Sequence, residues 1–156
     1  QKQTTPMRKL MMIALTSMLM ACGGNRVYYQ YEHIDEAGWG QKDTITFTTQ
    51  KLPAGRYHTS VCMRATQRYP YSDITISRHS IIQPSGSEKA ENFKCHIYNN
   101  VGIINGKRGV SSTELSFPLS DIVLSDSGSI TIKLQHRMSL DSLPGLTDVG
   151  IEITGE

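Results

Sequence analysis

Thr44-Ile45-Thr46-Phe47-Thr48-Thr49-Gln50 is the clearest local pattern in this 156-residue chain, because apolar and polar side chains alternate in it. A period of two residues is typical of a β-strand with one buried and one solvated face. Pro53-Ala54-Gly55 follows as a turn and leads into another apolar-rich run over residues 57–65.

Similar runs rich in Val, Ile, Thr, Tyr and Phe recur along the chain, separated by turn residues, and no helical period appears after Val27. We expect about eight strands, over residues 27–34, 44–50, 57–65, 73–82, 93–98, 114–119, 129–138 and 148–154. Residues 83–91 are predicted as a polar loop, and residues 120–124 fit either a helical turn or a strand. The chain is therefore predicted to be all-β, with a single antiparallel β-sandwich or jelly-roll-like domain over residues 27–156.

An apolar run from Leu10 to Met20 follows two basic residues and has the length of a secretory signal, too short to span a bilayer as a helix. It ends in Leu19-Met20-Ala21-Cys22, which fits a bacterial lipobox, although Met20 is bulkier than usual at its position. We expect residues 1–21 to be removed, including an upstream stretch before the candidate initiator Met7. Cys22 would carry the lipid, and residues 22–26 would form a lipidated tether. The alternative is an ordinary signal peptide in which Cys22 is incidental.

The charge balance excludes a nucleic-acid partner. The formal net charge of +2 at pH 7 includes Arg8 and Lys9 of the signal, so the mature chain is close to neutral. A neutral domain lacks the basic field that collects nucleic acid. No apolar run after Cys22 approaches the roughly 20 residues that a membrane-spanning helix requires.

Cys62 and Cys95 are the two cysteines left after the lipid site, and an oxidising compartment would permit a disulfide between them. Strand alternation argues against that bond, because Cys62 lies on the more polar face of its strand and Cys95 on the apolar face of another. Thiols that face opposite sides of a sheet cannot reach each other unless a bulge intervenes. Neither has a second ligand at zinc spacing, so we expect no metal.

The residues that could carry chemistry have no supporting motif. The five histidines share no metal-ligand spacing, and no serine or cysteine lies in a nucleophile-elbow context. Asp141 and Asp148 are expected to hydrogen-bond their own loop backbones, as turn aspartates do, in preference to forming a glycosidase pair. We therefore predict no catalytic residue, no cofactor and no enzymatic activity.

Two stretches are richer than ordinary strand sequence. Arg68-Tyr69-Pro70-Tyr71 fixes a backbone angle between two amphipathic rings, which predicts either a structural corner or a partner-binding patch. Pro144-Gly145, in the segment from Leu143 to Asp148, suits a type II turn with glycine at positive φ. The residues proposed from these stretches for partner binding are Arg64, Arg68, Tyr69, Pro70, Tyr71, Leu143, Pro144 and Asp148.

Taken together, these features resemble the gliding motility lipoprotein GldH family of Bacteroidetes. The resemblance is carried by the lipoprotein signal that ends at Cys22, by Asn25-Arg26-Val27-Tyr28, and by Trp39 shortly before the strand Ile45-Thr46-Phe47. It is also carried by the stretch from Arg64 through Tyr69-Pro70-Tyr71-Ser72-Asp73-Ile74 and by the segment from Met138 to Ile151. It is poor from Ser77 to Leu115. It implies an outer-membrane lipoprotein needed for gliding, a process that depends on the type IX secretion machinery, and it implies no catalytic residues.

The leading functional hypothesis is a non-enzymatic scaffold, held in the outer membrane by the lipid on Cys22, that contacts envelope proteins of the gliding and type IX secretion apparatus. Surface-displayed lipoproteins of Bacteroidetes often carry an acidic cluster after the lipid site. None follows Cys22, which favours the periplasmic face. The alternative is a glycan-binding lipoprotein in which Trp39, Tyr69 and Tyr71 form a platform for a sugar. A hydrolase has the least support.

Overall fold

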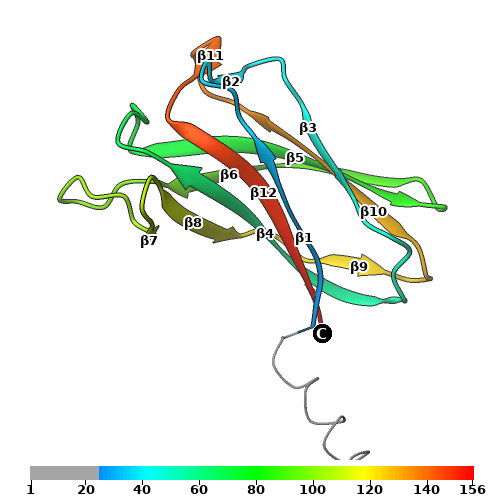
Figure 1. Ribbon diagram of the computed structural model, residues 1–156. Helices are drawn as coiled ribbons and strands as arrows, with labels where there is room; N and C mark the ends of the chain where they lie inside the picture. The colour runs from blue at the N-terminus through cyan, green and yellow to red at the C-terminus, as the bar shows by residue number, and fades with distance from the viewer. Residues whose placement is uncertain (1–24) are drawn as a thin grey trace, which may run out of the picture.

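Alternating buried and exposed side chains organise residues 25–156, the part of the chain that the computed structural model describes, into antiparallel β-structure (Figure 1). The strands are β1 (Arg26–His33), β2 (Trp39–Gly40), β3 (Ile45–Thr48), β4 (Gly55–Ala65), β5 (Asp73–Gln83), β6 (Ser87–His96), β7 (Lys107–Arg108), β8 (Thr113–Pro118), β9 (Ile122–Leu124), β10 (Ser129–His136), β11 (Ser142–Leu143) and β12 (Leu146–Gly155). The predicted all-β class is confirmed. The predicted signal peptide and Cys22 lie outside the described residues.

Each of the eight predicted runs coincides with one of the longer strands, and the other four strands are only two or three residues long. The predicted polar loop over residues 83–91 is wrong in its second half, because β6 already begins at Ser87. Charged side chains occupy that part of β6, an edge strand, and they hid the strand pattern. Residues 122–124 form a strand and not a helical turn.

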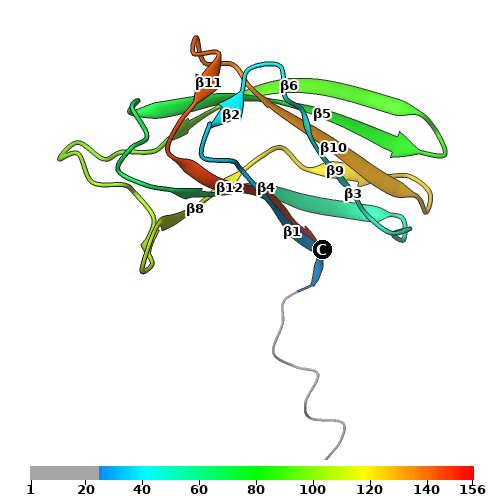
Figure 2. The same cartoon turned by 45° about the horizontal axis from the view of Figure 1, so that its top comes forward.

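Two sheets stack face to face, as Figure 2 shows. The six-stranded sheet has the order β1-β12-β4-β8-β7, with β9 paired to another part of β4. The four-stranded sheet has the order β3-β10-β5-β6, and β11 pairs with β2 separately. The inward side chains of β4 and β10 alternate strictly with outward ones and build the core from Tyr57, Val61, Met63, Ala65, Ile130, Ile132 and Leu134.

Trp39 and His136 close one end of this core. The Trp39 indole is 2% exposed, His136 is fully buried, and the two rings meet edge to face with centroids 5.3 Å apart. The Met138 N–H donates to His136 Nδ1 (3.2 Å), so the ring proton sits on Nε2 and donates to the Trp39 carbonyl (2.9 Å). Burial lowers the pKa of His136, which is therefore a neutral core residue.

We predict that acidification weakens the fold through His136. Its pKa is lower in the folded chain than its ordinary 6.5, so its contribution to stability is complete above pH 6.5 and is lost as the pH falls below that value. Urea unfolding between pH 5 and 8 should show this loss in the wild type. The same series for His136→Gln should lack that component, and an equal slope in both proteins would contradict the assignment.

Candidate functional site

The predicted aromatic corner connects β4 to β5, and the structure buries its central ring. Tyr69 is 2% exposed, and its hydroxyl donates to the Asp73 carbonyl at 2.8 Å. The Tyr98 hydroxyl donates in turn to the Tyr69 carbonyl at 2.8 Å. Tyr71 is half-buried against the Tyr69 ring, with centroids 6.2 Å apart. Tyr69 therefore holds the corner together, and the side chains it leaves at the surface are those of Arg68, Pro70 and, in part, Tyr71.

The Leu143–Asp148 segment packs directly on this corner. The Thr66 N–H donates to the Gly145 carbonyl at 2.8 Å, and Gly145 has the positive φ (89°) that the turn interpretation predicted. Leu143 is fully buried in β11, and Pro144 is half-buried. The two stretches singled out in the sequence thus form one structural unit, although they are more than seventy residues apart in the chain.

The sugar platform expected from Trp39, Tyr69 and Tyr71 does not exist in this fold. Trp39 and Tyr69 are each 2% exposed, and both are occupied by internal contacts. A ring must present a face to solvent before a sugar can stack on it. The structure therefore removes the observation on which the glycan-binding alternative depended.

Arg64 and Asp148 lie opposite each other on the outer face of the six-stranded sheet. The Arg64 guanidinium is 3.7 Å from carboxylate oxygens of both Asp148 and Glu114, and it stacks over the Tyr31 ring at 4.1 Å from the centroid. Asp148 also accepts from the Thr147 hydroxyl (2.9 Å), so it is a strand residue in an ion pair and not a turn aspartate bonded to its own loop. Arg64 thereby connects the predicted corner to an aromatic surface on β1.

That aromatic surface was missed by sequence reasoning. Tyr29 and Tyr31 point outward from β1 and meet edge to face with centroids 5.5 Å apart. The Arg26 guanidinium stacks over Tyr29 at 4.2 Å, as Arg64 stacks over Tyr31, which gives two cation–π contacts. We call Arg26, Tyr29, Tyr31 and Arg64 the tyrosine–arginine patch. The signal was present, because a strand over residues 27–34 places Tyr29 and Tyr31 on one face.

The acids around the patch fix its geometry. Arg26 pairs with Glu152 (2.7 Å), and the Tyr31 hydroxyl donates to Glu114 (3.0 Å). Burial, followed by hydrogen bonding and charge from its neighbours, raises the pKa of Tyr31 above its ordinary value of 10, so the hydroxyl stays protonated as a donor. Both rings are thus oriented before any partner arrives.

Cys62 lies under the same outer face and is 4% exposed, whereas Cys95 belongs to the inner face of the four-stranded sheet. The two thiols are free and lie in different sheets, which agrees with the alternation argument against a disulfide. Burial raises the pKa of both, to about 11 for Cys95. Neither is therefore a thiolate nucleophile near neutral pH.

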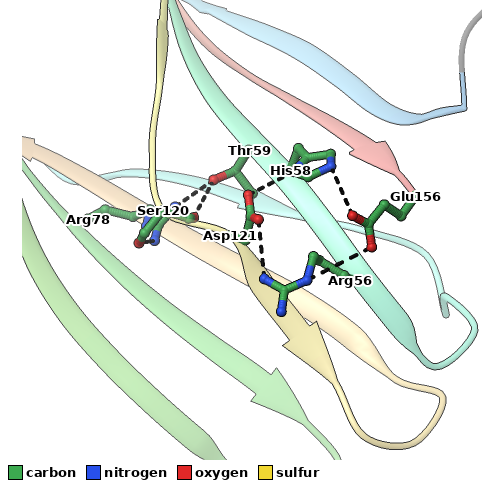
Figure 3. A network of polar contacts seen from close by, with 7 residues as sticks. All are labelled: Arg56, His58, Thr59, Arg78, Ser120, Asp121 and Glu156. Atoms are coloured by element: carbon green, nitrogen blue, oxygen red, sulfur yellow. Dashed lines mark hydrogen bonds and ion pairs between the residues drawn. The ribbon is translucent and has the colours of Figure 1, made fainter.

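A second polar cluster lies on the same sheet, at the end where the described chain begins (Figure 3). His58 Nδ1 and Arg56 Nη1 contact the Asp121 carboxylate at 2.8 and 3.3 Å, and Glu156 lies 3.9 Å from both side chains. The hydrogen bond with His58, with help from Arg56, lowers the pKa of Asp121.

The neighbouring Ser120 does not complete a catalytic triad with His58 and Asp121. Its hydroxyl donates to Glu91 (2.6 Å) and accepts from Arg78 Nη2 (2.7 Å). The His–Asp pair therefore has no serine to activate. Between residues 25 and 156, no group of three or more His, Cys, Asp or Glu side chains is placed to hold a metal ion.

The described residues form a β-sandwich domain with an arginine-capped aromatic surface, which places the protein among small all-β proteins. A family model described as GldH lipoprotein matches residues 26–153. The chain belongs to the GldH lipoprotein family, and the resemblance seen in the sequence is confirmed. Membership of a lipoprotein family implies association with a membrane through a lipid. In the described residues, no helix is long and apolar enough to cross a membrane.

No curated protein matches the chain. Among solved structures, it is similar to the VP2 subviral particle of infectious bursal disease virus (14% identity, TM-score 0.36, 82% of this chain and 30% of that chain). It is also similar to the CBM22-1–GH10 modules of endo-1,4-β-D-xylanase 10B from Clostridium thermocellum (15% identity, TM-score 0.38, 84% and 28%). A third is dimeric latent PorU from Porphyromonas gingivalis (10% identity, TM-score 0.34, 88% and 14%). The chain spans less than a third of each of these chains.

Proposed function

We propose that this protein is a non-enzymatic outer-membrane lipoprotein that supports gliding motility and the associated type IX secretion machinery by contacting other envelope proteins. The lipid would be attached to Cys22, and the domain would face the periplasm. The observation that carries the proposal is the tyrosine–arginine patch on a chain of the GldH lipoprotein family.

The composition of the patch favours a protein partner. Tyrosine and arginine are enriched among the few residues that dominate the binding energy of interfaces. Both rings of the patch are already held by arginines, so little side-chain freedom is left to lose on binding. A preoriented aromatic pair on an otherwise polar sheet face is suited to a specific and stable contact.

The position of the patch limits where its partner lies. The Gly155 N–H donates to the Asn25 carbonyl (2.7 Å), so the start of β1 and the end of β12 are together, as Figure 1 shows near the label C. Tyr31 is nine residues from Cys22, which at about 3.4 Å per residue places it within about 30 Å of the lipid. The partner must therefore present a surface close to the membrane.

Replacing both patch tyrosines, Tyr29→Ala with Tyr31→Ala, should lower recovery of gliding or type IX secretion proteins at least tenfold, the loss expected from two hot-spot residues. The measurement is in-cell cross-linking of the tagged lipoprotein, followed by mass spectrometry of what co-purifies from native outer membranes. Arg68→Ala with Tyr71→Ala tests separately whether the exposed part of the corner extends the same interface.

Thr46→Ala with Lys133→Ala is the matched control, because both residues lie on the outer face of the four-stranded sheet. The control should keep full recovery. If the tyrosine variant keeps its partners and only its melting temperature falls, the patch is structural and the proposed contact surface is wrong. Recovery of polysaccharide-uptake proteins in place of secretion proteins would contradict the proposed function itself.

A further inference from the structure

The six-stranded sheet is narrower than the four-stranded sheet where β9 forms its edge. On β5 and β6, the register pairs Arg78 with Glu91, Ser80 with Lys89 and Ile82 with Ser87, and places all of them on the inward face. Inward residues should be covered by the opposite sheet, yet Lys89 and Ser87 are exposed and Ile82 is only half-buried. In Figures 1 and 2 the β5–β6 hairpin projects past β9. Among the described residues, the six-stranded sheet therefore has no strand opposite this part of the β5–β6 hairpin.

An open groove occupies that position. One part, of about 180 Å³, lies between the inward side chains of β5–β6 and the edge of β9, and it includes Ser80, Lys89 and Val123. A second part, of about 300 Å³, shares Ile82, Ser87 and Val123 with the first and continues toward the hairpin turn. The groove is therefore elongated along the strands and mixed in polarity.

Two buried polar atoms in the groove lack partners. Arg78 is 1% exposed and Ser80 is 5% exposed, and both line the groove. Both terminal nitrogens of Arg78 are bonded within the fold, but Arg78 Nε and Ser80 Oγ have no hydrogen-bond partner among residues 25–156. Buried donors are rarely left unsatisfied in native proteins. Both atoms can donate a hydrogen bond to an acceptor that enters the groove.

The edge of β9 offers backbone groups to the same space. The Arg56 carbonyl accepts from the Glu156 N–H, which is on the β12 side of β4. In an antiparallel ladder the hydrogen-bonding direction alternates, so Val123, opposite Arg56, directs its N–H and C=O away from β4. Val123 is 52% exposed, as expected for a free edge.

We propose that this groove binds an extended peptide segment of a partner protein, which adds a strand to β9 and covers the inward face of the β5–β6 hairpin. The edge of Val123 supplies a donor and an acceptor at strand spacing, and Arg78 Nε and Ser80 Oγ serve further carbonyls. Strand addition of this kind takes its affinity from main-chain bonds and its specificity from alternate side chains.

The charges of the groove define the chemistry of the segment. Lys89 is paired with Glu91 (2.8 Å) and Asp121 with Arg56 (3.3 Å), whereas the carboxylate of Asp126 near the hairpin turn has no ion pair among residues 25–156. Ile82 supplies apolar contact from the inward face of β5. The segment is therefore free of acidic side chains, with small apolar side chains alternating toward the groove. The inference does not depend on the tyrosine–arginine patch, which is on the outer face.

The test pans a phage-displayed random heptapeptide library on the full-length lipoprotein in detergent, and measures synthetic copies of the enriched peptides. Ser80→Ala should weaken their binding about fivefold without lowering the melting temperature, because the hydroxyl has no hydrogen-bond partner among the described residues. Val123→Pro removes the outward N–H and should weaken binding at least tenfold. Ser77→Ala, on the outward face of β5, is the control and should change nothing.

Hydrogen exchange supplies an independent readout, since the bound peptide should protect the Val123 amide. The proposal would be overturned if no peptides are enriched, or if the Val123 amide stays unprotected. It would also be overturned if Ser80→Ala and Val123→Pro bind the peptides as tightly as the wild type does. A concentration-dependent dimer that Val123→Pro abolishes would also overturn it and assign the edge to a second copy of this chain. None of these outcomes bears on the partners of the tyrosine–arginine patch.

Discussion

Gly145→Ala is expected to destabilise the domain by about 3 to 5 kcal/mol, a large part of the stability of a domain of this size. Gly145 has φ of 89°, a conformation that costs a non-glycine residue about 1 to 3 kcal/mol. An added Cβ would also meet the backbone nitrogen and Cα of Tyr69 and lie 2.7 Å from the carbonyl carbon of Arg68. Those backbone atoms belong to the corner that Tyr69 locks, so they cannot move aside cheaply.

Gly102→Ala separates the two causes. Gly102 has a similar φ of 77°, but an added Cβ would have no atom within 4 Å, so only the backbone strain remains. Denaturant unfolding of both variants should show a loss of about 1 kcal/mol for Gly102→Ala and a much larger one for Gly145→Ala. Equal losses would mean that the approach to Tyr69 is not what makes Gly145 necessary.

Gly145 also shows how far the sequence can predict this fold. Pro144-Gly145 predicts a turn with positive φ, because the turn preferences of proline and glycine are local. The approach of Gly145 to Tyr69 depends on the pairing of β12 with β4, which no local pattern encodes. The strands were predictable for the same reason as the turn, since period-two alternation is local. The two-residue strands β2, β7 and β11 were not, because they form only when the longer strands bring their residues together.

The candidate contact surface was predictable only in part. Arg64 was chosen for its place near an aromatic corner, and that corner proved to be mostly buried. Its actual aromatic neighbour is Tyr31, which lies on β1 and reaches Arg64 on β4 across the intervening strand β12. Alternation on β1 predicts that Tyr29 and Tyr31 share one face, but it does not predict which arginines contact them. Contacts across a sheet follow from strand order, which a single sequence does not specify.

Arg78 is the strongest case of a feature that strand patterning conceals. It occupies an inward position in the alternation of β5, where apolar residues are the rule, and it is 1% exposed. Glu91 (2.7 Å), the Thr59 hydroxyl (2.6 Å) and the Ser120 carbonyl (2.9 Å) accept from its terminal nitrogens. Burial lowers the pKa of Arg78, while Glu91 opposes that effect. Arg78 therefore keeps its charge in the interior only because Glu91 pairs with it.

Glu91→Ala is accordingly expected to cost about 3 kcal/mol, the lower end of the range for breaking a buried ion pair, because Glu91 itself is 23% exposed. The measurement is denaturant unfolding at pH 7. Lys89→Ala is the matched control, since Lys89 contacts the same carboxylate from a side chain that is 66% exposed. That surface pair should contribute no more than about 1 kcal/mol.

The pH dependence and a double variant distinguish the ion pair from simple loss of packing. Hydrogen bonds from Lys89, Ser120 and Arg78 lower the pKa of Glu91 from 4.5 to about 2, so its contribution is complete above pH 4.5 and is lost as the pH falls toward 2. Glu91→Gln should lack that acid transition. Arg78→Met with Glu91→Ala removes both charges and should be more stable than Glu91→Ala alone, because no unpaired charge is left in the interior. If the double variant is instead the less stable of the two, packing of the Arg78 stem outweighs its charge, and the ion-pair account of this site fails.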